Sequence, residues 1–166
     1  MDQISNDSFE IALGNFNGDN RLYSFLDYIN ESFPSPTALI TGKNPFGLAV
    51  SDFNGDNYAD IAVGQIGNGN VGISLGPDDG TFRSQNSIAI DFGLSSVSVE
   101  NLNGDQFLDF LVPNNVANTV SVLLGYDNGT FASPKSFSTA ASPFTTVVAD
   151  FNHDNHFRLR CHQLSQ

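Results

Sequence analysis

Side chains that carry oxygen occupy three alternating positions of one short stretch, and a fourth follows soon after. They are Asp52, Asn54, Asp56 and Asp60. Gly55 lets the backbone turn tightly between them. Ca²⁺ takes about 6–8 oxygen ligands in flexible geometry, so carboxylate and amide oxygens crowded on one loop are typical of a calcium site. The backbone carbonyl of Tyr58 is a candidate for a fifth ligand.

The loop recurs along the chain, most clearly 49 residues later, a step that we call the repeat period. This copy offers the same series of ligands with fewer charges, and Phe107 takes the carbonyl position: Asn101, Asn103, Asp105, Phe107 and Asp109. Two further copies offer three ligands each and are weaker candidates: Asn15, Asn17 and Asp19 in the first, and Asp150, Asn152 and Asp154 in the last. A period of about 20–50 residues indicates a repeat architecture.

A hairpin turn without a metal remains the alternative for the loop over residues 52–60. Its three carboxylates would repel one another without a cation, which favours the metal. The loop is not an EF-hand, because its twelfth position is Val63 rather than glutamate and no helix pattern flanks it. We therefore expect calcium to bind with modest affinity, on the order of 10⁻⁴–10⁻³ M.

Short apolar runs between turn residues predict four strands in the second repeat, over residues 47–53, 59–65, 71–75 and 81–90. The third repeat, from residue 96 to about residue 140, follows the same plan. Four short strands per repeat describe one blade of a β-propeller. One column of the repeat is filled by large apolar residues that we expect in the core: Phe16, Phe53, Leu102 and Phe151.

The first and last repeats depart from this plan. The first lacks 12 residues, the counterparts of residues 59–70, and with them its second strand. A distorted hairpin is favoured there, and a short helix remains the alternative because four apolar residues fit helical spacing: Leu22, Phe25, Leu26 and Ile29. The last repeat has Arg158 where Asp60 and Asp109 stand, and we expect the pattern to be lost from that residue onward.

The charge of the chain limits its partners. Only 14% of the residues are charged and the formal net charge is −12, which argues against nucleic acid or an anionic membrane surface. No apolar run approaches the roughly 20 residues of a transmembrane helix, so we expect no membrane insertion. The single cysteine, Cys161, excludes an intrachain disulfide. The polar opening residues lack the pattern of a signal peptide.

Residues 9–157 resemble the FG-GAP repeat family, also called VCBS repeats, which is typical of the N-terminal part of integrin α chains. Phe46 and Gly47 stand at the family's Phe-Gly, and two dipeptides stand near its Gly-Ala-Pro: Val63-Gly64 and Val112-Pro113. A Leu-Gly-x-x-x-Gly-Thr-Phe hairpin occurs twice, over residues 75–82 and 124–131. The resemblance implies extracellular propeller blades that hold Ca²⁺ in interstrand loops and serve adhesion, ligand binding or, in some lectins, sugar recognition.

The prediction is an all-β fold, an incomplete β-propeller of four-stranded blades, with residues 158–166 as a diverged tail. Every Asp cluster is repeated and no catalytic motif appears, so we expect a non-enzymatic, calcium-binding extracellular module for protein interaction or adhesion. The alternatives are a carbohydrate-binding propeller and a propeller fragment of a larger secreted enzyme. The expected partner is a protein or glycan ligand, and uncovered outer blades favour self-association.

Asn30 and Asn128 share one column of the repeat and lie in Asn-x-Ser/Thr sequons. The sequon makes each a candidate glycosylation site in a secreted protein. Turn chemistry at a hairpin tip is the alternative, since Asp79 fills the same column in the second repeat.

Overall fold

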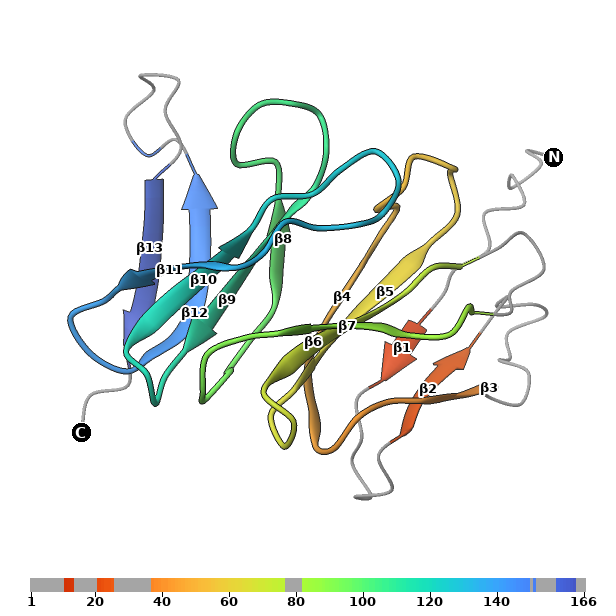
Figure 1. Ribbon diagram of the computed structural model, residues 1–166, viewed down its shortest axis with the longest axis horizontal. Coiled ribbons are helices and arrows are strands. Elements are labelled where there is room, and N and C mark those ends of the chain that lie inside the picture. The colour runs from red at the N-terminus through yellow and green to blue at the C-terminus, as the bar shows by residue number, and fades with distance from the viewer. Residues whose placement is uncertain are drawn as a thin grey trace, which may run out of the picture.

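The computed structural model describes residues 11–13, 21–25, 37–76, 82–149, 151 and 158–163. All regular structure among them is β-strand, arranged in antiparallel sheets of three, four, four and two strands. The sheets follow one another across the molecule in chain order, from β1–β3 at one end to β12 and β13 at the other (Figure 1). The predicted all-β fold of four-stranded blades is confirmed. Within the described residues, no helix is long and apolar enough to cross a membrane.

The second repeat forms one four-stranded sheet in sequence order: β4 (Pro45–Ser51), β5 (Asp60–Gln65), β6 (Asn70–Ser74) and β7 (Asn86–Ala89). The middle strands begin within one residue of the predicted positions. The first strand ends earlier than predicted, because the Phe53 amide donates to the Asp60 side chain instead of to a neighbouring strand. The fourth is shorter than predicted, because the Arg83 amide still bonds to the Leu75 carbonyl of the preceding hairpin, at 2.9 Å.

The third repeat builds the same sheet again from β8 (Ser98–Glu100), β9 (Asp109–Asn114), β10 (Thr119–Leu123) and β11 (Lys135–Ser138). The last three strands each begin one repeat period after their counterparts in the second repeat. Strand pairing also keeps the period, since Ser51 pairs with Asp60 and Glu100 pairs with Asp109. The repeat inferred from residue spacing is therefore a repeat of backbone structure.

The first sheet has three strands: β1 (Ile11–Leu13), β2 (Arg21–Phe25) and β3 (Thr37–Ile40). β2 and β3 begin one repeat period before β6 and β7, and no strand among the described residues stands for β5. The shortened sequence of the first repeat accounts for this difference. Leu22 and Phe25 lie in a strand, so the hairpin is correct for this part, while Leu26 and Ile29 fall outside the described residues.

The last sheet pairs β12 (Pro143–Ala149) with β13 (Arg158–Gln163). Ala149 pairs with Arg158, as Ser51 and Glu100 pair with their aspartates. The expectation that the pattern ends at Arg158 is wrong for the backbone, which keeps the repeat's pairing through Gln163. Strand register depends on the hydrogen-bonding backbone and on the length of the loop, and both persist although the aspartate side chain is gone.

The main core lies between the second and third sheets. Phe53 is buried there as predicted, and its ring meets Phe110 edge-on at 5.1 Å between centroids, while Phe110 stacks on Phe131 at 4.2 Å. Such aromatic pairs add about 0.5–1.5 kcal/mol to the free energy gained by burying their area. Phe151 is 41% exposed, against the prediction, because no described sheet covers its side of the last repeat. Phe16 lies outside the described residues.

Candidate metal-binding loops

Asp52 organises the backbone of the first loop that the structure describes. Its Oδ1 accepts hydrogen bonds from three backbone amides: Asn54 at 3.2 Å, Gly55 at 2.7 Å and Asp56 at 3.2 Å. Its Oδ2 accepts from the Asn57 amide at 2.8 Å. Gly55 and Asn57 adopt positive φ angles of 76° and 67°, which curl the chain around this carboxylate. The loop therefore closes on a negatively charged group that is anchored by the backbone.

Asn54 and Asp56 face each other across the same loop. The Asn54 Nδ2 donates to Asp56 Oδ2 at 2.8 Å, and the Asp56 amide donates to Asn54 Oδ1 at 3.1 Å. Asp56 Oδ1 also accepts from the Tyr58 amide at 2.9 Å. The alternating positions predicted from the sequence thus lie on one turn, where Asp52 and Asn54 are partly exposed and Asp56 is exposed.

Asp60 has a different place, because its side chain is fully buried. Its Oδ2 accepts from the Phe53 amide at 2.7 Å and its Oδ1 from the Gly76 amide at 2.8 Å. Burial raises the pKa of Asp60 above its ordinary value, and the nearby charges of Asp56 and Asp52 raise it further, while the two amide hydrogen bonds lower it. The carboxylate therefore ties the loop to the hairpin that follows β6.

Glycine is required at the hairpin position whose amide donates to the buried aspartate. A Cβ on Gly76 would lie 2.2 Å from the Ala59 carbonyl oxygen, and one on Gly125 would lie 2.1 Å from the Leu108 carbonyl oxygen. No side chain fits at such distances, so only glycine brings its amide close enough to the aspartate. The Leu-Gly pair of the repeated hairpin was a visible signal for this role, which the sequence interpretation missed.

The loop of the third repeat reproduces this arrangement. Asp109 is fully buried and accepts from the Leu102 and Gly125 amides at 2.8 and 2.9 Å. Asn103 Nδ2 donates to Asp105 Oδ2 at 2.7 Å, as in the second repeat. Asn101 Oδ1 accepts from the Gly104 amide at 2.8 Å, the counterpart of the bond from the Gly55 amide to Asp52 Oδ1. The geometry is shared and the negative charge is smaller.

The donor set of the loop over residues 52–60 fits a hard cation such as Ca²⁺, because every candidate ligand is an oxygen. A carboxylate offers about four lone-pair sites, so Asp60 keeps acceptor capacity beyond its two hydrogen bonds. Within the part of the chain that the structure describes, no three Asp, Glu, His or Cys side chains converge on one point as a preformed metal cage. The Asn side chains and the carbonyls of Tyr58 and Phe107 would have to complete the set.

Other candidate residues have partial or no description. The loop residues of the first repeat and those of the last repeat at positions 150, 152 and 154 lie outside the described residues, as does Asn30. Asn128 is exposed at the tip of its hairpin, and its Oδ1 accepts from the Thr130 amide at 3.0 Å and the Thr130 hydroxyl at 2.6 Å. This contact gives Asn128 the turn role; its glycosylation stays a prediction.

Comparison with known families agrees with the repeat structure. The profile of the FG-GAP-like repeat matches residues 52–112 and again residues 101–157. The two matches begin on the first ligand of each described loop and together cover more than half of the chain. A comparison with curated proteins gives no significant match.

Proposed function

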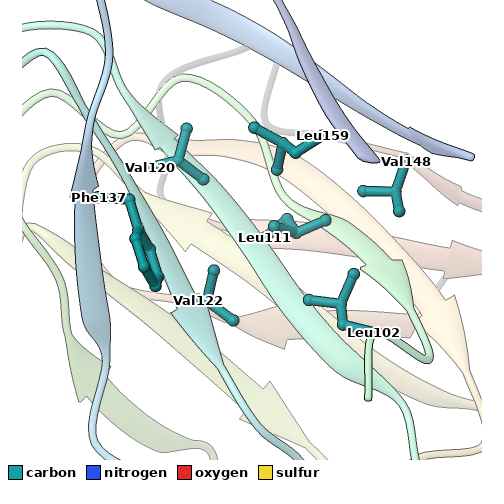
Figure 2. A pocket seen from close by; sticks show the side chains of 7 residues that line it. All are labelled: Leu102, Leu111, Val120, Val122, Phe137, Val148 and Leu159. Carbon is teal, nitrogen blue, oxygen red and sulfur yellow. The ribbon is translucent and has the colours of Figure 1, made fainter. Parts of the chain in front are cut away.

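Because the chain belongs to the family of FG-GAP-like repeats, we propose that it is a non-enzymatic, calcium-binding module that works outside the cell and presents a surface to protein partners. Repeated rather than unique acidic loops support a structural use of the carboxylates. The described cavity between the last two sheets is lined by aliphatic side chains and one phenylalanine (Figure 2), which favours a protein over a sugar as the ligand.

The observation that carries the calcium proposal is the shared geometry of two loops that lie one repeat period apart. In both, an exposed aspartate at the fifth position faces an asparagine at the third, and a buried aspartate at the ninth anchors the loop to the next hairpin. Asp52, Asp56 and Asp60 repel one another when ionised. A bound Ca²⁺ would supply the compensating positive charge.

The chain's own residues define what calcium binding would change. Asp52 already orders the turn, so binding costs little conformational entropy there. Asp56 contributes less to the loop's backbone structure than Asp52 does, because it accepts from the Tyr58 amide whereas Asp52 accepts from four backbone amides. Removing it should therefore weaken calcium binding more than it weakens the fold.

The first experiment is thermal unfolding in millimolar Ca²⁺ and in chelator, on the chain and on Asp56→Ala. At a calcium concentration about tenfold above Kd, binding adds about 1.4 kcal/mol, which raises the Tm by several degrees. We expect Asp56→Ala to remove most of this gain. Asp127→Ala, which removes an exposed carboxylate at the tip of a hairpin outside the loops, is the matched control and should keep it.

Each result decides one part of the proposal. An unchanged Tm in a folded sample would show that the loops are turns without a metal. A gain that Asp56→Ala and Asp127→Ala lose equally would place calcium elsewhere on the acidic surface.

A further inference from the structure

The sequence holds five Asn-Gly pairs, the dipeptide in which an asparagine side chain deamidates most readily, because glycine has no side chain to shield its backbone nitrogen. In this reaction the glycine nitrogen bonds to Cγ of the asparagine, the bond from Cγ to Nδ2 breaks, and the proton of the glycine N–H leaves with the nitrogen as ammonia. Water then opens the succinimide ring and gives aspartate or isoaspartate. Either product replaces a neutral amide by a carboxylate.

Two of the pairs that the structure describes are protected by their surroundings. The described pairs are Asn54-Gly55, Asn68-Gly69, Asn103-Gly104 and Asn128-Gly129. Gly129 is buried, and a Cβ on it would lie 2.9 Å from Leu75 Cδ2, so solvent base does not reach its nitrogen. Gly69 is held on both sides, since its amide donates to the Gln65 carbonyl at 2.9 Å and its carbonyl accepts from the Ile90 amide at 2.8 Å.

The other two pairs, Asn54-Gly55 and Asn103-Gly104, occupy the same place in the two described loops. Both glycines are exposed, and a Cβ on either would meet no atom within 4 Å. In both loops the asparagine Oδ1 accepts from the amide two residues later, that of Asp56 at 3.1 Å and that of Asp105 at 3.0 Å. This bond bends the asparagine side chain back along the glycine, which is the approach that ring closure needs.

The two loops differ in the group that holds the glycine amide. The Gly55 amide donates to the carboxylate of Asp52 at 2.7 Å, whereas the Gly104 amide donates to the neutral Asn101 Oδ1 at 2.8 Å. A hydrogen bond to a carboxylate is roughly twice as strong as one between neutral groups. The negative carboxylate also opposes loss of the amide proton, because the amide anion would lie beside it. The Gly104 nitrogen is therefore the freer nucleophile.

We propose that Asn103 is a site of spontaneous deamidation in the folded protein and that Asp52 protects Asn54 from the same reaction. The aspartate product carries carboxylates at residues 103, 105 and 109, as many as the loop over residues 52–60 has. One consequence rests on the calcium function proposed above: the modified loop binds Ca²⁺ more tightly, because affinity depends on the number of charged ligands. The third repeat thus acquires by chemistry the charge that the second repeat has by sequence.

The test follows deamidation of the full chain in chelator at mildly alkaline pH. Digestion and mass spectrometry at successive times locate each converted asparagine by fragmentation. We expect Asn103 to convert at least about fivefold faster than Asn54, because the charge-assisted hydrogen bond holds the Gly55 amide more strongly. In denaturant the two rates should converge, since neither loop is then formed. Equal rates in the folded chain would overturn the proposal, because both sites would then react only after unfolding.

Exchanging the acceptors tests the cause. Asn101→Asp keeps an acceptor oxygen for the Gly104 amide and makes it a carboxylate, so it should slow deamidation of Asn103 by about the same fivefold factor. Asp52→Asn should speed deamidation of Asn54. Gln106→Glu is the matched control, since it adds the same charge at an exposed position of the loop. An Asn101→Asp chain that slows no more than Gln106→Glu would overturn the proposed protection.

The Asn103→Asp variant separates this proposal from the calcium proposal. It carries the charge of the deamidated loop, so we expect calcium to raise its Tm more than that of the unmodified chain. A variant whose Tm ignores calcium would refute the calcium proposal. The deamidation rates are measured in chelator, so they would still establish Asn103 as the modified residue.

Discussion

The carboxylates of Asp60 and Asp109 are each both buried and hydrogen-bonded to two backbone amides. Each is fully buried, and each accepts hydrogen bonds from two backbone amides, which follow the two strands that flank its own strand. A buried ionised group is tolerated only when its hydrogen bonds are made, so the tie and the burial depend on each other. The structural role holds without a cation, and the metal-ligand role inferred from spacing stays a prediction.

The Asp60→Asn substitution tests the structural role in chelator. The asparagine keeps one acceptor oxygen but turns an amide donor toward a backbone N–H, so we expect the free energy of unfolding to fall by about 1–3 kcal/mol. Denaturant titration measures the change. Asp105→Asn, at an exposed position, should stay within about 0.5 kcal/mol. Equal losses for the two variants would show that the buried hydrogen bonds contribute nothing special.

Two kinds of glycine shape the elements around these carboxylates. Gly104 turns the loop with a φ of 77° and has open space around it, whereas Gly125 sits where a Cβ would meet the Leu108 carbonyl. We expect Gly104→Ala to cost about 1–2 kcal/mol through backbone strain. Gly125→Ala should cost about 2–4 kcal/mol, because the hairpin must move away and release Asp109. Denaturant titration of both variants measures the two losses. A larger loss for Gly104→Ala than for Gly125→Ala would contradict a stabilising hydrogen bond between Gly125 and Asp109.

Spacing along the chain predicted the strands well because period and pairing register are local properties. Steps of one repeat period connect the starts of β5, β9 and β13, including the strand that begins at Arg158. Burial could not be predicted this way, because it depends on which sheet packs against a residue. Phe53 and Phe151 share a column, yet Phe53 has the third sheet beside it. No described sheet covers Phe151, and the Arg160 guanidinium lies 4.7 Å from the centroid of its ring. The two hydrogen bonds that Asp60 accepts from the backbone could not be predicted from the sequence either, because one of the donors, Gly76, lies 16 residues away.

At the scale of the molecule, the sheets are stabilised mainly by what lies between them. Phe110 is fully buried and contacts Phe53 from the preceding repeat, so the second and third sheets share one core. Leu159 holds the same column one repeat later but is 41% exposed. In repeat proteins the interfaces between neighbours carry a large part of the stability, so these two positions should differ sharply.

Phe110→Ala and Leu159→Ala measure that difference. We expect Phe110→Ala to lower the free energy of unfolding by about 3–5 kcal/mol, since it leaves a cavity in the shared core. Leu159→Ala should cost less than about 1 kcal/mol, because Leu159 is half-exposed and little apolar contact is lost. Denaturant titration gives both values, and hydrogen exchange shows which strands respond. Phe110→Ala should speed amide exchange in β5 as well as β9, because one core joins them. Faster exchange confined to β9 would mean that the two sheets unfold independently, which contradicts a shared core.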